Sequence, residues 1–348
     1  MQRWKTLFRT DTRRVLRRLY GDGARFQGLQ ERAIGAIMAN KSPVVVVMGT
    51  GGGKSLCFMV PAASCPGGVT VVVVPLVSLL GDMVRRCGLL GIGCAEWKSD
   101  RVPGQVSIVF VTPESAMSKR FQDYLEGLRV TAQLDRIVVD ECHTILEGSK
   151  KFRPRLRELG QLGLVGVQMV YLTATLPPIR QPDFLALLFV RETEVEMMRM
   201  RTTRTNIRYS VQTTRPGSGG SEDETTEVVR RVLDAKLEEH AWPAKIIIYC
   251  RTVEGTGSLA EQLGCDAYYR EIDTRDGKAE RLRAWAGGMK RGGYGEGRVI
   301  VATNALGLGI DVGDIRVVVH VGMPYEMADY AQQSGRAGRD GLRSEAIV

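Results

Sequence analysis

Short apolar runs recur along the chain, and each is followed by a turn signal and a stretch compatible with a helix. These runs cover residues 44–48, 69–75, 106–112, 136–140, 169–173, 245–250, 266–270, 299–303 and 316–321. Continuous β-branched runs separated by helical segments are typical of parallel strands that are covered by helices on both faces. The pattern therefore predicts repeated βα units, arranged as two similar α/β domains in tandem.

The boundary between the two domains is predicted near Arg201, which gives domains at residues 1–200 and 201–348. The segment 197–208 is basic and lacks clear periodicity, and the stretch 218–225 is interpreted as a flexible acidic loop. A chain of 348 residues is also too long for one ordinary core. Length and pattern thus agree on two domains.

The first apolar run leads into a glycine-rich stretch, GTGGGKS, at residues 49–55. In a strand–loop–helix context, glycines let main-chain N–H groups turn inward around phosphate oxygens, Lys54 can reach the outer phosphates and Ser55 can take a Mg²⁺ site. Met48 stands where the strict pattern has glycine, and the alternative is a glycine-rich hairpin or linker. The residues predicted to bind nucleotide here are Thr50, Gly51, Gly52, Gly53, Lys54 and Ser55.

Two acids, Asp140 and Glu141, follow the apolar run that ends at residue 139. After a phosphate-binding loop, the first acid suits Mg²⁺ held through water, and the second can orient and deprotonate an attacking water. On their own, two acids after a strand would more often cap a helix. The preceding loop favours the catalytic interpretation for both acids.

The second half ends in QQSGRAGRDG, which places Arg336 and Arg339 three residues apart, predicted to share one helical face. Guanidinium groups suit the charge that builds on a transferring phosphoryl group, so both arginines are candidate catalytic residues delivered by the second domain. A basic solvated helix is the alternative for this element. Thr173 and Thr175 end a strand at the predicted ligand edge, where hydroxyl groups could relay the nucleotide state.

Composition narrows the class of protein and the class of partner. Hydrophobic residues make up 44% of the chain and charged residues 25%, as in globular domains, and no run is apolar enough to span a bilayer. The seven cysteines show no paired CxxC spacing, so no zinc site is expected. A net charge of +9 favours a polyanionic partner, and basic clusters at 13–18, 150–157 and 199–208 make nucleic acid the preferred one.

The motifs together resemble the superfamily 2 helicases and, among them, the RecQ family. The resemblance covers the chain from about residue 16 to its end. It rests on TGGGKSLCF at 50–58, VVVVPLVSLL at 71–80, VTPE at 111–114, DECH at 140–143, TAT at 173–175, IIYC at 247–250, VATNALGLGID at 301–311 and QQSGRAGRDG at 332–341. The fold that this implies is two tandem RecA-like (P-loop NTPase) domains, each a parallel sheet flanked by helices.

The resemblance also assigns roles to residues that no pattern singles out. It implies that Phe26 stacks on adenine, that Gln30 reads the edge of the base and that Asp311 touches the ribose. It implies that residues in four positions couple the ATP state to DNA contacts, namely His143, Thr173, Thr175 and Gln332. It implies nucleic-acid contacts at Ser78, Thr112, Phe152, Arg153 and Thr303.

The implied activity is an ATP-dependent DNA helicase or translocase that moves 3′ to 5′ on single-stranded DNA, with ATP and Mg²⁺ as cofactors. A monomeric motor core without a membrane contact, in the nucleus, is the corresponding expectation. Two alternatives stay open, a degenerate nucleic-acid-binding remnant and an RNA helicase of the DExH type. The chain departs from the family at Gln27, where arginine is common, and at Lys150 and Lys151, where an aromatic loop is usual.

The chain stops at Val348, inside a predicted strand, and the family's zinc-binding and winged-helix modules would follow it. The sequence is therefore interpreted as a fragment or a truncated copy. Its closest resemblance is to the RecQ-like helicases found near fungal telomeres.

Overall fold

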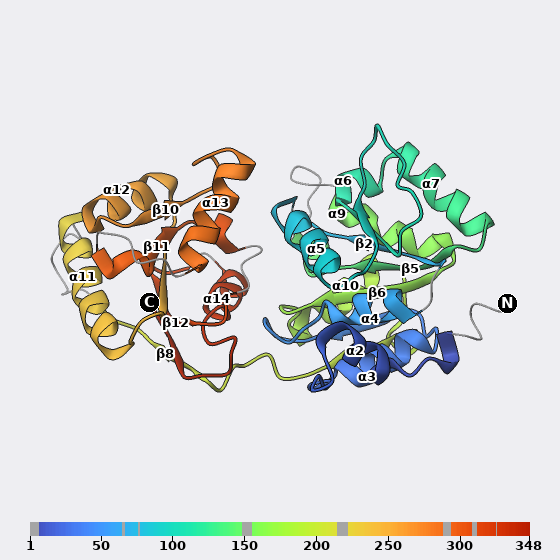
Figure 1. The fold of residues 1–348 in the computed structure, drawn as a ribbon, viewed down its shortest axis with the longest axis horizontal. Coiled ribbons are helices and arrows are strands. Elements are labelled where there is room, and N and C mark those ends of the chain that lie inside the picture. The colour runs from blue at the N-terminus through green and yellow to red at the C-terminus, as the bar shows by residue number, and fades with distance from the viewer. Residues whose placement is uncertain are drawn as a thin grey trace. The chain divides into compact units, whose positions relative to one another are not determined.

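The structure of the chain is a computed structural model with two compact units, Met1–Thr202 and Thr203–Val348 (Figure 1). It describes residues 7–64, 67–75, 77–147, 155–213, 222–287, 294–307, 312–324 and 326–348. The sequence had predicted a boundary near Arg201. Each unit is a parallel sheet with helices on its faces, which is the predicted fold class. Among the described helices, none combines the length and the apolar composition that crossing a membrane requires.

The first unit is built on a sheet with seven strands in its described residues, in the order β3-β4-β2-β5-β6-β1-β7. All the strand pairs are parallel, and Val47 at the end of β1 lies beside Thr173 of β6 and Arg199 of β7. The strands are β1 (Val44–Val47), β2 (Val69–Val73), β3 (Cys94–Glu96), β4 (Ile108–Val111), β5 (Leu134–Val139), β6 (Gln168–Thr173) and β7 (Glu196–Arg199).

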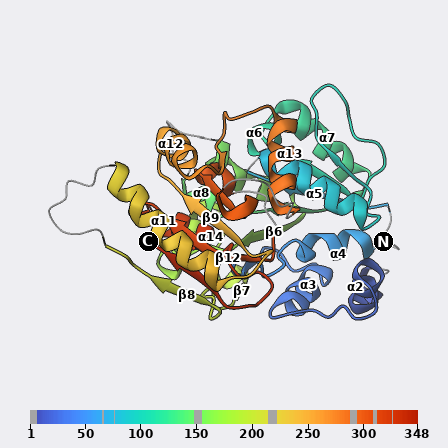
Figure 2. The same ribbon diagram turned by 60° about the vertical axis from the view of Figure 1, so that its left-hand side comes forward.

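Alternation along β1 divides the core of the first unit into two layers. Val44 and Val46 pack with α2–α5, whereas Val45 and Val47 face the opposite layer, which contains α7 and α10. Helices α2, α3 and α4 pack together beneath the sheet (Figure 2). The α-helices are α2 (Thr12–Tyr20), α3 (Gln30–Met38), α4 (Leu56–Ser64), α5 (Val77–Leu89), α6 (Pro113–Ala116), α7 (Lys119–Val130), α8 (Thr144–Glu147), α9 (Arg155–Glu158) and α10 (Gln181–Leu187). Short 3₁₀ helices cover η1 (Leu159–Val165), η2 (Pro178–Arg180) and η3 (Glu192–Glu194).

The second unit repeats the plan with six parallel strands in its described residues, in the order β10-β11-β9-β12-β13-β8. Its strands are β8 (Ile207–Ser210), β9 (Lys245–Tyr249), β10 (Asp266–Tyr268), β11 (Val299–Ala302), β12 (Ile315–His320) and β13 (Ser344–Ile347). Its helices are α11 (Glu222–Glu239), α12 (Val253–Leu263), α13 (Arg275–Ala286), α14 (Met327–Ser334), η4 (Tyr294–Gly297) and η5 (Asn304–Gly307). In both sheets, polar loops follow the carboxyl ends of the central strands, which is where parallel sheets bind ligands.

Two predictions about the connecting segments were wrong. The stretch 197–208 contains most of β7 and the start of β8, short edge strands whose mixed burial leaves no apolar run to detect. The stretch 218–225 was interpreted as a loop, but α11 begins at Glu222 within it. Acidic residues at that position favour a helix start, because they face the positive end of the helix dipole.

Candidate functional site

The glycine-rich loop after β1 has a main-chain shape that side chains would prevent. Gly51 and Gly53 have φ values of 76° and 72°, and a Cβ atom on Gly53 would lie 2.4 Å from the Gln30 amide nitrogen. A Cβ on Gly52 would lie 2.9 Å from the Gly49 carbonyl oxygen. The loop therefore folds tightly before α4, and Thr50 and Ser55 lie half-buried within it. A main-chain cradle of this kind suits phosphate oxygens.

Lys54 and the two acids come together beneath this loop. The Lys54 Nζ lies 3.9 Å from Oε1 of Glu141 and donates to the Met48 carbonyl oxygen at 3.4 Å. Asp140 is buried, and its Oδ1 accepts the Glu141 N–H at 3.0 Å. Burial raises the pKa of Asp140, the Glu141 carboxylate raises it further, and Lys54 opposes both. The predicted catalytic set of the first unit is thus one cluster.

Glu141 is held in an unusual conformation. Its φ of 45° lies in the left-handed region, which residues with a side chain rarely adopt. One of its carboxylate oxygens, Oε2, is buried without a hydrogen-bond partner among the described residues. A buried carboxylate oxygen with spare acceptor capacity suits a group that takes a proton from a bound water.

His143 connects the Glu141 carboxylate with Thr173, the last residue of β6. The His143 Nδ1 lies 2.9 Å from the Thr173 Oγ1 and 3.5 Å from Oε2 of Glu141. The Thr173 Oγ1 also accepts the Thr175 N–H at 3.1 Å, and the Thr173 carbonyl accepts the Met48 N–H at 3.0 Å. The predicted coupling residues of this unit therefore connect the acid pair with the strand that leads into the glycine loop.

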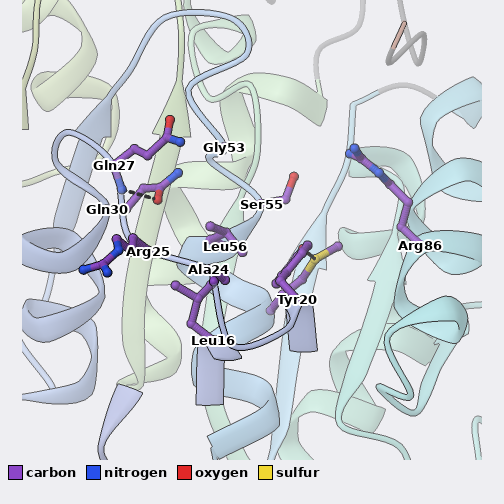
Figure 3. Close-up of a pocket in the computed structure, with 12 residues that line it drawn as sticks. Leu16, Tyr20, Ala24, Arg25, Gln27, Gln30, Gly53, Ser55, Leu56 and Arg86 are labelled. Carbon is purple, nitrogen blue, oxygen red and sulfur yellow. Dashed lines mark hydrogen bonds between the residues drawn. The ribbon is translucent and has the colours of Figure 1, made fainter. Parts of the chain in front are cut away.

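A pocket of about 590 Å³ opens beside the glycine loop (Figure 3). Gln30 is buried at its edge, where its amide donates to the Gly52 carbonyl at 2.9 Å and accepts the Gln27 N–H at 2.8 Å. Figure 3 shows Gln27 and Gln30 on one side of the pocket and Arg86 on the other. Phe26 is partly buried against the neighbouring core and does not line the pocket.

Several lining residues were not predicted from the sequence. Tyr20 of α2, Arg25 of the following loop and Arg86 of α5 reach the pocket from separate segments. Each belongs to a pattern that is typical of an ordinary helix or turn, so only the fold brings them together. Leu16, Leu56 and Met59 give the pocket an apolar part, as is usual for sites that bind a planar base.

The two arginines of the second unit lie beyond the end of α14, so their predicted shared helical face was wrong. The helix ends at Ser334, and Gly338, with a φ of 58°, turns the chain out of the helical path. Arg336 is only 3% exposed, and its Nε and Nη1 have no hydrogen-bond partner among the described residues. Arg339 lies half-buried one residue past the turn at Gly338.

A buried polar chain lies behind these arginines. The His320 Nε2 lies 2.9 Å from Oε1 of Gln333, whose Nε2 donates to Oδ1 of Asn304 at 2.8 Å. His320 also stacks on Tyr249, with ring centroids 5.5 Å apart. The family resemblance implies a coupling role for Gln332, which is half-buried, whereas the glutamine in this buried chain is its neighbour Gln333. Helical periodicity along α14 places Gln332 and Gln333 on different faces, so it could have identified Gln333 as the buried one.

Three predicted nucleic-acid residues are placed as follows. The Thr112 Oγ1 caps α6 by accepting the Ser115 N–H at 3.3 Å. The Thr303 Oγ1 accepts the Ala305 N–H at 3.3 Å, and Ser78 belongs to α5. Phe152, Arg153 and Asp311 lie outside the described residues.

The basic cluster at 199–208 is not simply a solvated face. Arg199 Nη1 donates to the Leu176 carbonyl at 2.5 Å and Arg204 Nη2 donates to the Gly338 carbonyl at 2.5 Å, so both guanidinium groups bind main-chain oxygens. Burial lowers the pKa of each. Arg201 and Arg208 remain exposed. Only part of this cluster is therefore presented to a polyanion.

Within the described part of the chain, no group of three or more His, Cys, Asp or Glu side chains is arranged to hold a metal ion. A nucleotide-bound Mg²⁺ needs fewer protein ligands, because it keeps several waters and takes phosphate oxygens. The Ser55 hydroxyl and the Asp140 carboxylate are oxygen donors of the kind that such an ion uses.

Comparison with known proteins agrees with this geometry. A family model described as DEAD/DEAH box helicase matches residues 27–183, and one described as Helicase conserved C-terminal domain matches residues 225–341. The chain is similar to a solved structure of Dbp5 from S. cerevisiae bound to RNA and ADP BeF3, with a TM-score of 0.72 and 15% identity over 98% of this chain and 87% of that one. At that identity, the likeness supports the fold.

Curated relatives are more similar in sequence. The putative ATP-dependent DNA helicase Q1 of Caenorhabditis briggsae is 34% identical over 93% of this chain and 53% of its own length. ATP-dependent DNA helicase Q5 of Rattus norvegicus is 32% identical over 95% of this chain and 35% of its own length. The chain thus spans about half, or less, of the relatives it matches. Both family models describe helicases, and the relatives that match over at least 93% of this chain are DNA helicases of the Q1 and Q5 types, so the chain belongs to the RecQ-like helicases.

Proposed function

We propose that this chain is the motor core of an ATP-dependent DNA helicase. The observation that carries the proposal is the cluster of Lys54, Asp140 and Glu141 beneath the glycine loop, next to a pocket of about 590 Å³. This volume lies in the range of sites that bury small ligands. The relatives' names, ATP-dependent DNA helicases, support ATP as the nucleotide and DNA as the track.

The residues of the first unit fit a nucleotide triphosphate with Mg²⁺. The main chain leaves no room for a Cβ atom on Gly52 or Gly53, Lys54 supplies a cation beside it, and Glu141 has a buried oxygen that lacks a hydrogen-bond partner among the described residues. In the proposed complex, Ser55 and Asp140 hold the ion, which would neutralise phosphate charge. The pocket at Gln30 and Tyr20 takes the base, in agreement with the implied role of Gln30.

In the proposed reaction, Glu141 orients a water and accepts its proton, while Lys54 stabilises charge on the outer phosphates. His143 holds the Glu141 carboxylate through the contact at 3.5 Å, and Thr173 holds the His143 ring through the contact at 2.9 Å. Because these contacts continue to Thr175 and Met48, a change at the phosphates can be passed to β6 and β1. Coupling to a strand of DNA would follow from such a shift.

Arg336 and Arg339 are proposed to act on the same phosphoryl group from the second unit. The two Arg336 nitrogen atoms that lack partners among the described residues suit a group that meets its partner only when the nucleotide is present. Movement 3′ to 5′, a monomeric state and a nuclear location are further proposals, which rest on the family resemblance alone.

The test is ATP hydrolysis by the purified 348-residue chain, with and without single-stranded DNA. Glu141→Gln and Lys54→Ala should each lower DNA-stimulated turnover by about 10²-fold or more, because each removes a group that acts on the transferring phosphate. Glu126→Gln and Lys119→Ala are matched controls on the exposed surface of α7, and they should keep wild-type turnover.

Two further measurements on the same preparation separate the alternatives. They are the stimulation of ATP hydrolysis by RNA or DNA strands, and the affinity for a strand with and without ATP. Turnover that single-stranded RNA stimulates more strongly than matched DNA would assign an RNA helicase. Strand affinity that is equal with and without ATP, together with no turnover, would assign a nucleic-acid-binding remnant and overturn the proposal.

A further inference from the structure

Two side chains at the start of the second unit reach across to the turn that carries the arginines. Arg204 donates through Nη2 to the Gly338 carbonyl at 2.5 Å, and its longer contacts reach the Gly335 carbonyl at 3.4 Å and the Ala337 carbonyl at 3.5 Å. One guanidinium therefore spans the carbonyl oxygens of three residues in the turn that follows α14.

Asn206 completes the contact from the next turn of the same segment. Its Nδ2 donates to the Gly338 carbonyl at 2.9 Å and to the Leu342 carbonyl at 2.8 Å. Its Oδ1 accepts the Arg204 Nε–H at 3.2 Å, so the two side chains support each other. The Asn206 carbonyl also accepts the Ser344 N–H at 2.9 Å. We call this pair of side chains the linker clamp.

The clamped carbonyl belongs to the residue that lies between the two arginines. Gly338 follows Arg336 by two positions and precedes Arg339, and its φ of 58° sets the turn of the main chain between the two arginines. The fit is tight, since a Cβ atom on Gly338 would lie 2.5 Å from the Asn206 Nδ2. A shift of this carbonyl would therefore move both guanidinium groups.

The chain just before the clamp is bound in the first unit. The Met200 N–H donates to the Val47 carbonyl at 3.1 Å, and the Thr202 carbonyl oxygen lies 3.3 Å from where a Cβ atom on Gly49 would be. Thr202 thus lies against the glycine loop, and only Thr203 separates it from Arg204 in the sequence. The clamp thus begins two residues beyond the last residue of the first unit.

We propose that Arg204, supported by Asn206, is a positioning residue for Arg336 and Arg339. It acts through main-chain carbonyls and holds the turn so that both arginines point correctly at the transferring phosphate. This inference rests on the proposed function, since it gives Arg336 and Arg339 their role in ATP turnover.

The test compares Arg204→Ala with Arg231→Ala in the full chain, by steady-state ATP hydrolysis with saturating single-stranded DNA. Arg204→Ala should lower kcat by about 10²-fold, because a misplacement near 1 Å is enough for such a loss, while binding of a fluorescent ATP analogue stays within about 2-fold. Arg231, on the exposed surface of α11 in the same unit, carries the same charge, and its removal should leave kcat unchanged.

Folding and positioning are separated by two further measurements. Active sites are counted by the stoichiometry of analogue binding, so that a smaller folded fraction cannot imitate a lower kcat. Arg204→Lys should recover part of kcat, since one amine can reach the Gly338 carbonyl but cannot span three. Amide exchange in residues 335–342 should be faster in Arg204→Ala than in wild type.

A wild-type chain that does not hydrolyse ATP would refute the proposed function itself. A wild-type chain that is active, with an Arg204→Ala variant of unchanged kcat per active site, would refute the linker clamp as a positioning device alone. Equal losses in Arg204→Ala and Arg231→Ala would also refute it, because charge and not position would then be the cause.

Discussion

The two units share a parallel-sheet plan but build their ligand edges by different means. In the first unit the site is a main-chain cradle, in which Gly51 and Gly53 adopt positive φ and neither Gly52 nor Gly53 has room for a Cβ atom. In the second unit the turn after α14, which lies beside the start of β12, presents Arg336 and Arg339 and is held by side chains from another segment. A cradle binds through main-chain atoms, which every residue has, whereas an arginine side chain must be held in position by its surroundings.

The opposite edges of the two sheets also differ. Arg136 in β5 is fully buried, and its Nε donates to Gln168 at 2.9 Å and its Nη1 to Thr70 at 3.1 Å. In the second unit the corresponding buried cations pair with carboxylates, Lys245 with Asp314 at 2.6 Å and Arg316 with Asp340. The buried cation of the first sheet is thus held by neutral side chains, whereas those of the second sheet form ion pairs.

The largest expected effect separates binding from turnover. Arg336→Ala should lower kcat for ATP by about 10³-fold while nucleotide affinity stays near wild type, because the arginine acts on the transition state. The exposed Arg343→Ala is the matched control and should change neither. Fluorescence titration with an ATP analogue and single-turnover hydrolysis measure the two quantities. If Arg336→Ala weakened nucleotide binding as much as it lowered kcat, the arginine would act in binding, as the main-chain cradle does, and the distinction between the two units would be lost.

An intermediate effect compares one glycine in each unit. Gly53→Ala and Gly338→Ala each force a side chain onto a φ of 72° or 58° and into a close contact, so each should cost about 2 kcal/mol locally. Gly53→Ala should weaken nucleotide binding, whereas Gly338→Ala should spare it and lower kcat.

Calorimetric titration of an ATP analogue and steady-state hydrolysis distinguish the two glycine variants. Gly21→Ala, at a φ of 92° with nothing near its Cβ, is a control for backbone strain without a clash. If Gly338→Ala also weakened nucleotide binding, the assignment of binding to the first unit and of turnover to the second would be contradicted.

The smallest expected effect is a pH dependence of stability that arises from His320 in the second unit. Burial lowers the pKa of His320 to about 4, below its ordinary value of 6.5, so the folded state favours the neutral ring. This stability is present above about pH 6.5 and is lost as the pH falls toward 4. Wild type should therefore lose about 1 kcal/mol more than His320→Gln between pH 7 and roughly pH 5.5.

Urea unfolding followed by tryptophan fluorescence at each pH measures that difference for His320. Carboxylates titrate in both proteins and cancel in the comparison. Parallel pH curves for wild type and His320→Gln would contradict the burial of a neutral histidine behind the arginines.

Much of the first unit's site could be predicted because its residues are adjacent in the sequence. Gly51 to Ser55 form one loop, and Asp140, Glu141 and His143 lie within one turn of each other. Their chemistry is limited to the ends of apolar strands, which the hydrophobic pattern reveals. The predicted strands at 44–48 and 136–140 correspond to β1 and β5, which lie on either side of β6 and so bring these two segments together.

The other residues of the site could be identified only from the fold. Tyr20, Arg25 and Arg86 meet only because α2, its following loop and α5 converge on one pocket. Arg204 was counted with a basic cluster, since nothing local distinguishes a guanidinium that binds carbonyls from one that is solvated. The short strands β7 and β8 were missed because edge strands with mixed burial have no periodic signal.

The left-handed backbone of Glu141 has a consequence for evolution. A residue with a side chain at a φ of 45° costs roughly 1 kcal/mol or more, which glycine would avoid. Glu141→Gly is therefore a substitution that would stabilise the chain and end hydrolysis in a single step. Copies of this gene released from selection for activity should drift to glycine or asparagine here before they lose the fold, so this codon can serve as a marker of abandoned function.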